Sequence, residues 1–307
     1  MYRRVHFDIC GICNARCPWC VTGRTRSKGA GILSLETFTR AVEVMLERGI
    51  LSPDGCVYLY NWGEPLLHPN LREIIAFVRD AGLRCALSTN ASKAVLFDEP
   101  ASLVHLDYMC FSISGFSQAS YDRIHGLDFE TVRENIRRIV ENYRQCGFAG
   151  VAQIIFHLYR FNLDEVAPAV AFARDLGIHL LPHAAYLAGY HMMKDYLTGR
   201  MPPDELKHAE EDLLLSHLHQ SAASVPADYV CPQYDFLSLD EYCNVLTCCA
   251  LDRSHEHYTI GSLFDLSPDE IDHRRRAQPV CRECLDLGIS TLFHNPLTAE
   301  EVAVRYK

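Results

Sequence analysis

Long apolar runs are absent from this sequence of 307 residues. No stretch reaches the roughly 18 consecutive apolar residues that a membrane-spanning helix requires, so we predict no membrane partner. The amino terminus also lacks a signal-peptide pattern, because Arg3 and Arg4 precede only a short apolar run. Both absences predict a cytoplasmic protein. A hydrophobic fraction of 49% is ample for one large domain, or for one large and one small domain.

Positive charge is scarce. The net charge is −10, which disfavours a nucleic-acid partner, because such binding rests on neutralising phosphates, and permits a cationic one. Between positions 201 and 250 Lys207 is the only lysine or arginine. We interpret the acidic residues of segment 204–212 as a solvated helix face. Four later acidic residues lie around cysteines and are predicted to be able to meet a cationic substrate, namely Asp228, Asp235, Asp240 and Glu241.

Cysteine, in contrast, is abundant. Fourteen cysteines are unexpected in a reducing compartment unless many bind metal. They concentrate in two groups, Cys10, Cys13, Cys17 and Cys20 near the start and Cys231, Cys243, Cys248, Cys249, Cys281 and Cys284 near the end. The remaining four are interpreted as structural, and these are Cys56, Cys85, Cys110 and Cys146. We therefore predict two metal sites, one toward each end of the chain.

Strand and helix patterns alternate through the first two thirds of the chain. Strands are predicted at 5–9, 57–60, 83–88, 108–113, 151–158 and 178–181, and helices at 34–48, 71–80, 131–144 and 163–176. Six alternations over roughly 190 residues predict an α/β fold, a partial (β/α)6 barrel, because a full eight-unit barrel takes about 250 residues. A doubly wound open sheet would give the same periodicity. We predict a barrel at 1–195, a helical connector at 196–226 and a small cysteine-bearing domain at 227–307.

The first cysteine group contains Cys13, Cys17 and Cys20 in a C-x3-C-x2-C spacing after the first strand. Three thiolates hold three corners of a [4Fe–4S] cube and leave one iron open for a small molecule. Zinc is the alternative, but structural zinc takes four ligands in paired short spacings. The motif resembles that of the radical S-adenosylmethionine (radical SAM) enzymes, which have a partial barrel fold, bind SAM at the open iron and cleave it to a 5′-deoxyadenosyl radical.

This resemblance implies a set of SAM-binding residues at the ends of successive strands. The sequence Asn61-Trp62-Gly63-Glu64-Pro65 is similar to the family's Gly-Gly-Glu motif, whose backbone and carboxylate hold the SAM amino group, although Trp62 replaces the first glycine. By the same resemblance, the backbone at Trp19 meets the adenine. Two further strand ends resemble SAM-binding elements, with Asn90 in a Thr-Asn element and Ser112 as a partner of the ribose, followed by Ser114 in place of an acid.

The carboxy-terminal cysteines resemble the twitch or SPASM-type extension of radical SAM enzymes. This implies one auxiliary [4Fe–4S] cluster on four ligands, Cys231, Cys248, Cys281 and Cys284, and hence two clusters in all. A zinc ribbon is the alternative, since four cysteines suffice for it. Cys243 takes a turn position where glycine is typical. If Cys248 faces the cluster, its neighbour Cys249 faces away and is free to give a hydrogen atom to a carbon radical; a spare cysteine, or Cys249 as the ligand, are the alternatives.

A thiol opposite the adenosyl radical predicts epimerisation. The chain resembles radical SAM epimerases of aminoglycoside biosynthesis (neomycin C to neomycin B type), which implies a cationic aminoglycoside substrate and an electron donor such as a flavodoxin or ferredoxin. A dehydrogenase of an amino sugar or cyclitol, using the auxiliary cluster as electron acceptor, is a second hypothesis. A peptide-modifying enzyme is a third, less favoured because the first strand starts at residue 5 and leaves no room for a leader-peptide domain. A metal-bearing scaffold is a fourth.

Overall fold

Nine strands form a single sheet in this computed structural model, which describes residues 1–26, 30–187, 189–223, 225–226, 228–251, 258–292 and 297–305. Their order in the sheet is β6-β5-β4-β3-β2-β1-β7-β8-β9. The first six are β1 (Tyr2–Phe7), β2 (Leu51–Tyr58), β3 (Arg84–Thr89), β4 (Leu106–Ile113), β5 (Val151–Leu158) and β6 (His179–Ala184). These six pair in parallel with their sequence neighbours, which confirms the predicted partial barrel and excludes the order reversal of a doubly wound sheet.

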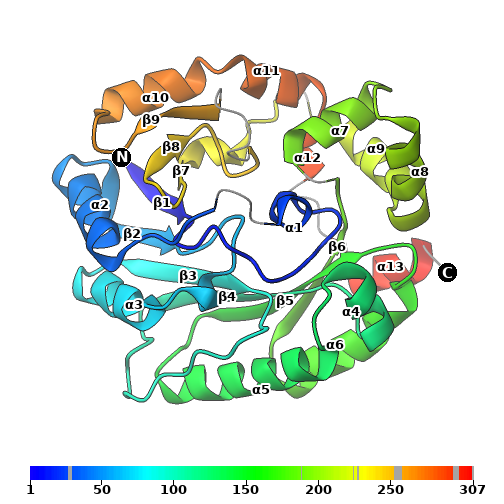
Figure 1. Cartoon of the computed structure of the whole chain (residues 1–307), viewed down its shortest axis with the longest axis horizontal. Helices are drawn as coiled ribbons and strands as arrows, with labels where there is room; N and C mark the ends of the chain where they lie inside the picture. The colour runs from blue at the N-terminus through cyan, green and yellow to red at the C-terminus, as the bar shows by residue number, and fades with distance from the viewer. Residues whose placement is uncertain are drawn as a thin grey trace.

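The helices between these strands cover the outside of the curved sheet (Figure 1). They are α2 (Leu35–Glu47), α3 (Leu71–Asp80), α4 (Gln118–Ile124), α5 (Phe129–Gln145) and α6 (Val166–Asp175), with short 3-10 turns η1 (Pro65–Leu67) and η2 (Leu163–Glu165). Ser34 caps α2 as predicted, because its hydroxyl accepts from Thr37 N at 3.0 Å. The bounds of α3 and β5 are those that the sequence predicts.

Strand β2 begins six residues earlier than predicted, at Leu51. The cause is a break in the apolar pattern at Pro53-Asp54-Gly55, which the strand passes as an irregularity in its pairing with β1. Gly55 is needed there, since a Cβ atom would lie 2.8 Å from Ser52 O. The alternation of apolar residues therefore marks only the second half of this strand.

The carboxy-terminal third extends the same sheet instead of forming a new one. Strand β7 (Phe236–Leu239) pairs in parallel with β1, and β8 (Asn244–Leu246) and β9 (Thr259–Ser262) follow in antiparallel pairing. The turn between β7 and β8 contains Cys243 at a φ of 61°, which accounts for the expectation of glycine at this position. Ala227, where the sequence places the start of this region, lies outside the described residues.

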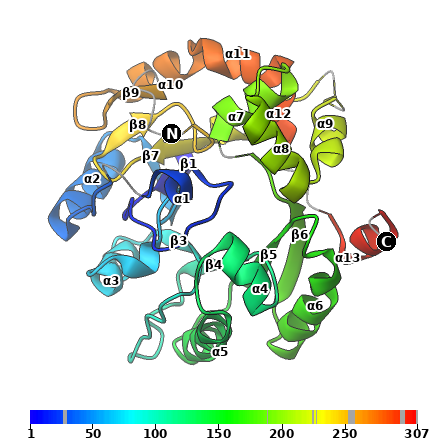
Figure 2. The ribbon, with the colours of Figure 1, turned by 45° about the vertical axis from the view of Figure 1, so that its right-hand side comes forward.

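Helices of the last third lie against the two ends of the sheet. Three of them, α7 (Gly189–Leu197), α8 (Pro203–Asp212) and α9 (Leu215–Ala223), follow β6, and α8 and α9 lie within the segment 196–226 that the sequence predicts as a helical connector. The helices α10 (Pro268–Arg276) and α11 (Pro279–Asp286) run past β8 and β9, and α12 (Ile289–Leu292) and α13 (Ala299–Arg305) lead back toward β6 (Figures 1 and 2). Within the described residues, no helix combines the length and apolarity needed to cross a bilayer.

Candidate functional site

Cys13, Cys17 and Cys20 of the first group lie on the loop that joins β1 to α1 (Val21–Thr25). In both views α1 lies inside the arc of strands (Figures 1 and 2). Two glycines allow other segments to approach this loop closely. A Cβ atom on Gly63 would lie 1.6 Å from Cys10 O, and a Cβ atom on Gly23 would lie 2.4 Å from Cys17 O. Only glycine fits at either position, so both loops around the cysteines are held by backbone contact.

The thiols of this loop are buried and interact electrostatically, although among the described residues no three His, Cys, Asp or Glu side chains converge as ligands of a single metal ion. Burial raises the pKa of Cys13 to about 12 and also raises the pKa values of Cys17 and Cys20. Each pKa is raised further by nearby negative charge, from other cysteines of the loop and from the carboxylates of Glu64 and Asp8. Thiolates crowded in this way need a cation between them, and the donor set therefore fits a metal cluster.

Asn90, which the sequence predicts to lie near SAM, reaches this loop from the end of β3. Its Nδ2 lies 3.6 Å from Cys13 Sγ and donates to Asn14 Oδ1 at 3.1 Å. The backbone N–H of Asn90 donates to Glu64 Oε2 at 2.7 Å. One residue thus links the strand-three loop to both the cysteine loop and the strand-two loop.

His125 also touches the cysteine loop, and the sequence analysis missed it. Its Nε2 accepts a hydrogen bond from Ser114 N at 3.1 Å, and its Nδ1 lies 3.3 Å from Cys17 Sγ. Burial lowers the pKa of His125 to about 4, so the ring is neutral and carries one proton. Because Nε2 accepts, that proton is on Nδ1, and His125 donates to the sulfur of Cys17.

Glu64, the predicted ligand of the SAM amino group, is completely buried. Its Oε1 accepts from Thr89 Oγ1 at 2.6 Å and from Leu66 N at 2.9 Å, and its Oε2 accepts from Asn90 N. Burial raises the pKa of Glu64 to about 7 against these hydrogen bonds. A carboxylate has about four acceptor positions, so Glu64 joins two loops and keeps one position for an ammonium group.

Asp8 holds the predicted SAM loop from the end of β1. Its carboxylate accepts from Trp62 N at 3.0 Å and from Gly63 N at 3.4 Å. The side-chain Nδ2 of Asn61 and Nε1 of Trp62 are buried and have no hydrogen-bond partner within the described part of the chain. Two buried donors without protein partners at this position are consistent with a polar ligand.

Two of the five acidic residues of α8 depart from the solvated face that the sequence predicted, whereas Asp204, Glu210 and Glu211 are exposed. Asp212 accepts from the indole Nε1 of Trp19 at 3.0 Å and pairs with Arg123. Glu205 pairs with Arg24 on α1 at 2.5 Å. The prediction was therefore wrong for these two residues, which fasten the cysteine loop to the connector. The hydrogen bond from Trp19 to Asp212 fixes the Trp19 side chain against α8, while the Trp19 backbone stays next to Cys20.

Serine side chains lie at the ends of β3 and β4, as predicted. The hydroxyls of Ser112 and Ser88 are 3.3 Å apart on adjacent strands. Ser114 bonds through its hydroxyl to His157 Nδ1 at 3.0 Å. Burial lowers the pKa of His157 to about 3, so this ring is neutral as well. The barrel edge near the first cysteines is therefore polar and uncharged on this side.

The predicted ligands of the second group line one cavity. Its lining includes Cys231, Cys248, Cys281 and Cys284, which come from three segments, because Cys281 and Cys284 are both on α11. Cys249 does not line this cavity and instead donates its thiol hydrogen to Gln233 Oε1 at 3.0 Å. Cys243 is completely buried in its turn and is likewise outside the cavity.

Cys249 lies toward the first cysteine group. Burial raises the pKa of Tyr186 to about 12, and the next contributions come from the charges of Cys20 and Cys249. Cys249 contributes in the same way to the raised pKa of Tyr60, at the end of β2. Tyr186 is thus within electrostatic reach of both cysteine groups, and the Cys249 thiol is on the side of the barrel.

Three of the four acidic residues that the sequence set aside for a substrate have other positions or roles. Asp240 is buried and accepts from Tyr242 N, Asn244 N and Asn244 Nδ2, and the buried Glu241 accepts from Gly31 N. Asp235 precedes β7, at the amino ends of the parallel strands and away from the cysteine loop. The prediction was wrong for these three. Asp228 is exposed.

The sequence model described as the radical SAM superfamily matches residues 8–173, more than half of the chain. The chain belongs to the radical SAM superfamily. PqqA peptide cyclase of Gluconobacter oxydans (strain 621H) is 26% identical over 230 residues, 72% of this chain and 59% of that protein. AdoMet-dependent heme synthase of Methanosarcina barkeri (strain Fusaro / DSM 804) is 25% identical over 222 residues, 71% of this chain and 58% of that protein. The chain thus spans less than two thirds of either curated relative.

Solved radical SAM structures share the fold of this chain. BtrN in complex with AdoMet and 2-DOIA gives a TM-score of 0.51 at 13% identity and covers 98% of this chain and 97% of its own. Native anSMEcpe with bound AdoMet gives a TM-score of 0.57 at 14% identity and covers 94% and 88%. At these identities the likeness concerns the fold alone.

Membership in this radical SAM superfamily implies a [4Fe–4S] cluster and SAM. The buried thiols of Cys13, Cys17 and Cys20 fit the cluster, and the donors from Asn90 and His125 satisfy its sulfur ligands. The buried donors at positions 61 and 62 and the free acceptor position of Glu64 are consistent with SAM beside it.

Proposed function

We propose that this radical SAM protein is an epimerase that inverts a sugar carbon of an aminoglycoside, of the neomycin C to neomycin B type, and that Cys249 returns the hydrogen atom. The observation that carries this proposal is the position of Cys249. Its thiol is outside the four-cysteine cavity, donates to Gln233, and lies in the neighbourhood of Tyr186, as Cys20 also does. A dehydrogenase has no need of a protonated thiol at this point.

The cavity fits the auxiliary [4Fe–4S] cluster that the proposal includes. Cys231, Cys248, Cys281 and Cys284 would hold it, since these four thiols, and not Cys249, line the space. Burial raises the pKa of Cys248 to about 12, with further raising from Cys281 and Cys231, as expected for thiols that a metal centre must neutralise. The outward position of Cys249 favours Cys248 as the ligand.

When bound and reduced, the first cluster and SAM would supply the 5′-deoxyadenosyl radical that removes a hydrogen atom from the substrate carbon. The chain's own part follows from the state of Cys249. Burial raises the pKa of this thiol, so it keeps its hydrogen, and Gln233 orients the S–H bond. Transfer of that hydrogen atom breaks the S–H bond, forms the new C–H bond and leaves a sulfur radical, which one electron and one proton restore to the thiol.

The electron would come from a one-electron carrier such as a flavodoxin or ferredoxin, through the auxiliary cluster beside Cys249. Cytoplasmic residence supplies such carriers and belongs to the proposal. Asp228 is left as the candidate among the four acidic residues for an ammonium group of the substrate, because it is exposed. We propose that the other residues that contact the substrate lie at the edge of the barrel near the first cysteine group.

A peptide is the second candidate substrate, and the curated relatives favour it. The relative from Gluconobacter oxydans is named as a peptide cyclase, and one from Bacillus subtilis (strain 168), 22% identical over 206 residues, is named as a subtilosin biosynthesis protein. The matched regions cover only 59% and 42% of the lengths of these two relatives.

The deciding experiment is anaerobic turnover of neomycin C with SAM and a reductant in deuterated water. An exchangeable thiol must place solvent deuterium at the inverted carbon. Cys249→Ala should still cleave SAM yet give no inverted product, whereas Cys146→Ala, a buried cysteine outside both groups, should behave as the parent. An inverted product without deuterium would exclude Cys249 as donor, and an oxidised product would favour the dehydrogenase.

A further inference from the structure

Arg275 is buried, and it is the one lysine or arginine with that status among the described residues, at 2% exposure. Burying a cation is costly unless an anion or hydrogen-bond acceptors compensate for lost water. Its neighbours on α10, Arg274 and Arg276, show the usual behaviour and keep their side chains about half exposed in ion pairs with Glu270 and Asp272. Arg275 therefore calls for a specific explanation.

The hydrogen bonds of Arg275 go to neutral groups. Its Nε donates to Thr247 O at 3.0 Å and its Nη2 donates to Gln233 O at 2.9 Å. The guanidinium also lies 5.2 Å from the centre of the Tyr2 ring. Main-chain carbonyls orient the guanidinium but do not cancel its charge. The carboxylate of Asp272 also interacts electrostatically with Arg275, but it accepts its hydrogen bonds from Arg276 and Tyr2. Both carbonyls belong to segments that carry cluster ligands, next to Cys248 and two residues after Cys231.

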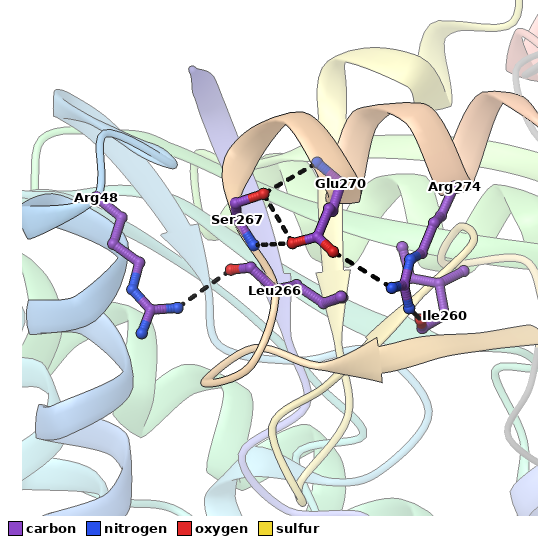
Figure 3. Close-up of polar contacts among 6 residues, drawn as sticks. All are labelled: Arg48, Ile260, Leu266, Ser267, Glu270 and Arg274. Carbon is purple, nitrogen blue, oxygen red and sulfur yellow. Dashed lines mark hydrogen bonds and ion pairs between the residues drawn. The ribbon is translucent and has the colours of Figure 1, made fainter.

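Helix α10 is anchored so that Arg275 faces inward. Ser267 and Glu270 form a capping box at its first turn, and Arg48, the residue after α2, donates to Leu266 O at 3.1 Å just before it (Figure 3). Arg274 donates to Ile260 O of β9 at 3.1 Å (Figure 3). With both the start and the last turn of the helix fixed, the direction of the Arg275 side chain is set by the fold.

Arg275 lines the same cavity as the four cysteines. Its guanidinium donates to Thr247 O, next to Cys248, and to Gln233 O, two residues after Cys231, so the positive charge lies in the wall that these cysteines share. A cube with four thiolates is an anion, and it becomes more negative on reduction. A fixed cation in a low-dielectric interior stabilises the more negative state most.

We propose that Arg275 is the counter-cation of the auxiliary cluster, promoting its assembly and shifting its reduction potential to a more positive value. The proposal rests on the second cluster of the proposed function and names a residue that controls it. Arg275 acts on the cluster through its positive charge. The same guanidinium also fixes the main chain at Gln233 through the hydrogen bond from Nη2. Its role is electrostatic and positioning, since it holds no iron.

The test uses the full-length chain with Cys13, Cys17 and Cys20 changed to Ala, so that only the second cluster is observed. In this background Arg275→Gln, Arg275→Lys and the matched control Arg274→Gln are compared by iron content and by a redox titration followed by electron paramagnetic resonance. Arg274 is on the same helix and also bonds a main-chain carbonyl, but does not line the cavity. None of these readouts depends on turnover.

We expect the potential to become more negative in Arg275→Gln, to stay near the parent in Arg275→Lys, and to be unchanged in Arg274→Gln. Loss of iron in Arg275→Gln with retention in Arg275→Lys would support the same role. Equal potentials and iron contents in the Gln variant and the parent, or a Lys variant that matches the Gln variant, would overturn it. If the protein with an unchanged Arg275 bound no second cluster, the proposal for Arg275 would be overturned. Failure of the epimerase proposal is detected separately, because neomycin C would then give no inverted product.

Discussion

The two cysteine groups have similar ligands and opposite surroundings. The first is three cysteines on one short loop, beside the carboxylates of Asp8 and Glu64 and the neutral ring of His125. The second draws four cysteines from three segments around a cavity that is also lined by the buried Arg275. One site is set in negative and neutral groups, and the other is set against a positive charge.

This difference matches the work that the two sites are proposed to do. A cluster that passes an electron to SAM needs a low potential, which nearby negative charge and the absence of a buried cation favour. A cluster that stores or relays an electron beside Cys249 functions at a less negative potential, which Arg275 favours. The chain thus separates two redox tasks by the charges that it buries near otherwise similar sulfur ligands.

Removal of one ligand from each group gives the largest expected effect. Cys17→Ala should lower SAM cleavage by more than about 100-fold, beyond the cost of losing an outer partner of a metal ligand. Cys281→Ala should retain SAM cleavage and lose only the second cluster. Iron content and formation of 5′-deoxyadenosine would measure both. If Cys281→Ala abolished cleavage as Cys17→Ala does, the division of tasks would be refuted.

Gly63→Ala tests the backbone contact that supports the first site. The added Cβ atom would meet Cys10 O at 1.6 Å, and backbone cannot move aside as a side chain can. We expect a loss of about 3 kcal/mol or more, at the upper end of overpacking costs, and loss of the first cluster. Gly199→Ala, where a Cβ atom would have no neighbour within 4 Å, controls for replacing a glycine without a clash, although its φ of 68° adds a strain that Gly63→Ala does not have. A Gly63→Ala protein with normal iron and SAM cleavage would contradict the structure here.

His125→Phe should change the first cluster and leave the second unaltered. The variant loses the hydrogen bond to Cys17 Sγ, and loss of a donor to a cluster sulfur makes the reduction potential more negative. SAM cleavage should fall by about 10–100-fold with the same reductant. Redox titration separates this effect from misfolding, and His125→Gln should recover part of it. An unchanged potential would show that His125 has only a packing role.

The elements that the sequence predicts well are those set by local patterns. Periodicity places α3 and β5 at their observed bounds, and the spacing of Cys13, Cys17 and Cys20 identifies the family that the comparison confirms. The broken half of β2 was missed because Pro53-Asp54-Gly55 interrupts its pattern while tertiary pairing maintains the strand.

Residues whose role depends on distant contacts were missed or misassigned. His125 follows a short helix with no motif, and it meets Cys17, 108 positions away, only through the fold. Arg275 stands in the basic run 273–276, which resembles an exposed helix end, and its burial depends on β8 and η3 (Pro232–Asp235). Asp240 and Glu241 looked available for a substrate because their turn and loop partners are not visible in a linear sequence.

Acid should weaken the region of the first site and not the region of Arg275, which is the smallest effect expected. Burial lowers the folded-state pKa of His157 from 6.5 to about 3, so below pH 6.5 the unfolded chain binds a proton that the folded chain does not. Stability is therefore present above pH 6.5 and lost as the pH falls, by about 1 kcal/mol between pH 7.5 and 5.5 from this residue.

Urea unfolding of the parent and of His157→Gln at the two pH values would measure this contribution. The variant keeps a partner for Ser114 and should lose about 1 kcal/mol less on acidification. Hydrogen exchange should show faster opening around β5 at pH 5.5 and unchanged protection in α10, since a guanidinium does not titrate in this range. If the parent and His157→Gln lost equal stability on acidification, His157 would not be the cause of the acid effect. If α10 opened before β5, the two regions would not differ in acid sensitivity as we predict.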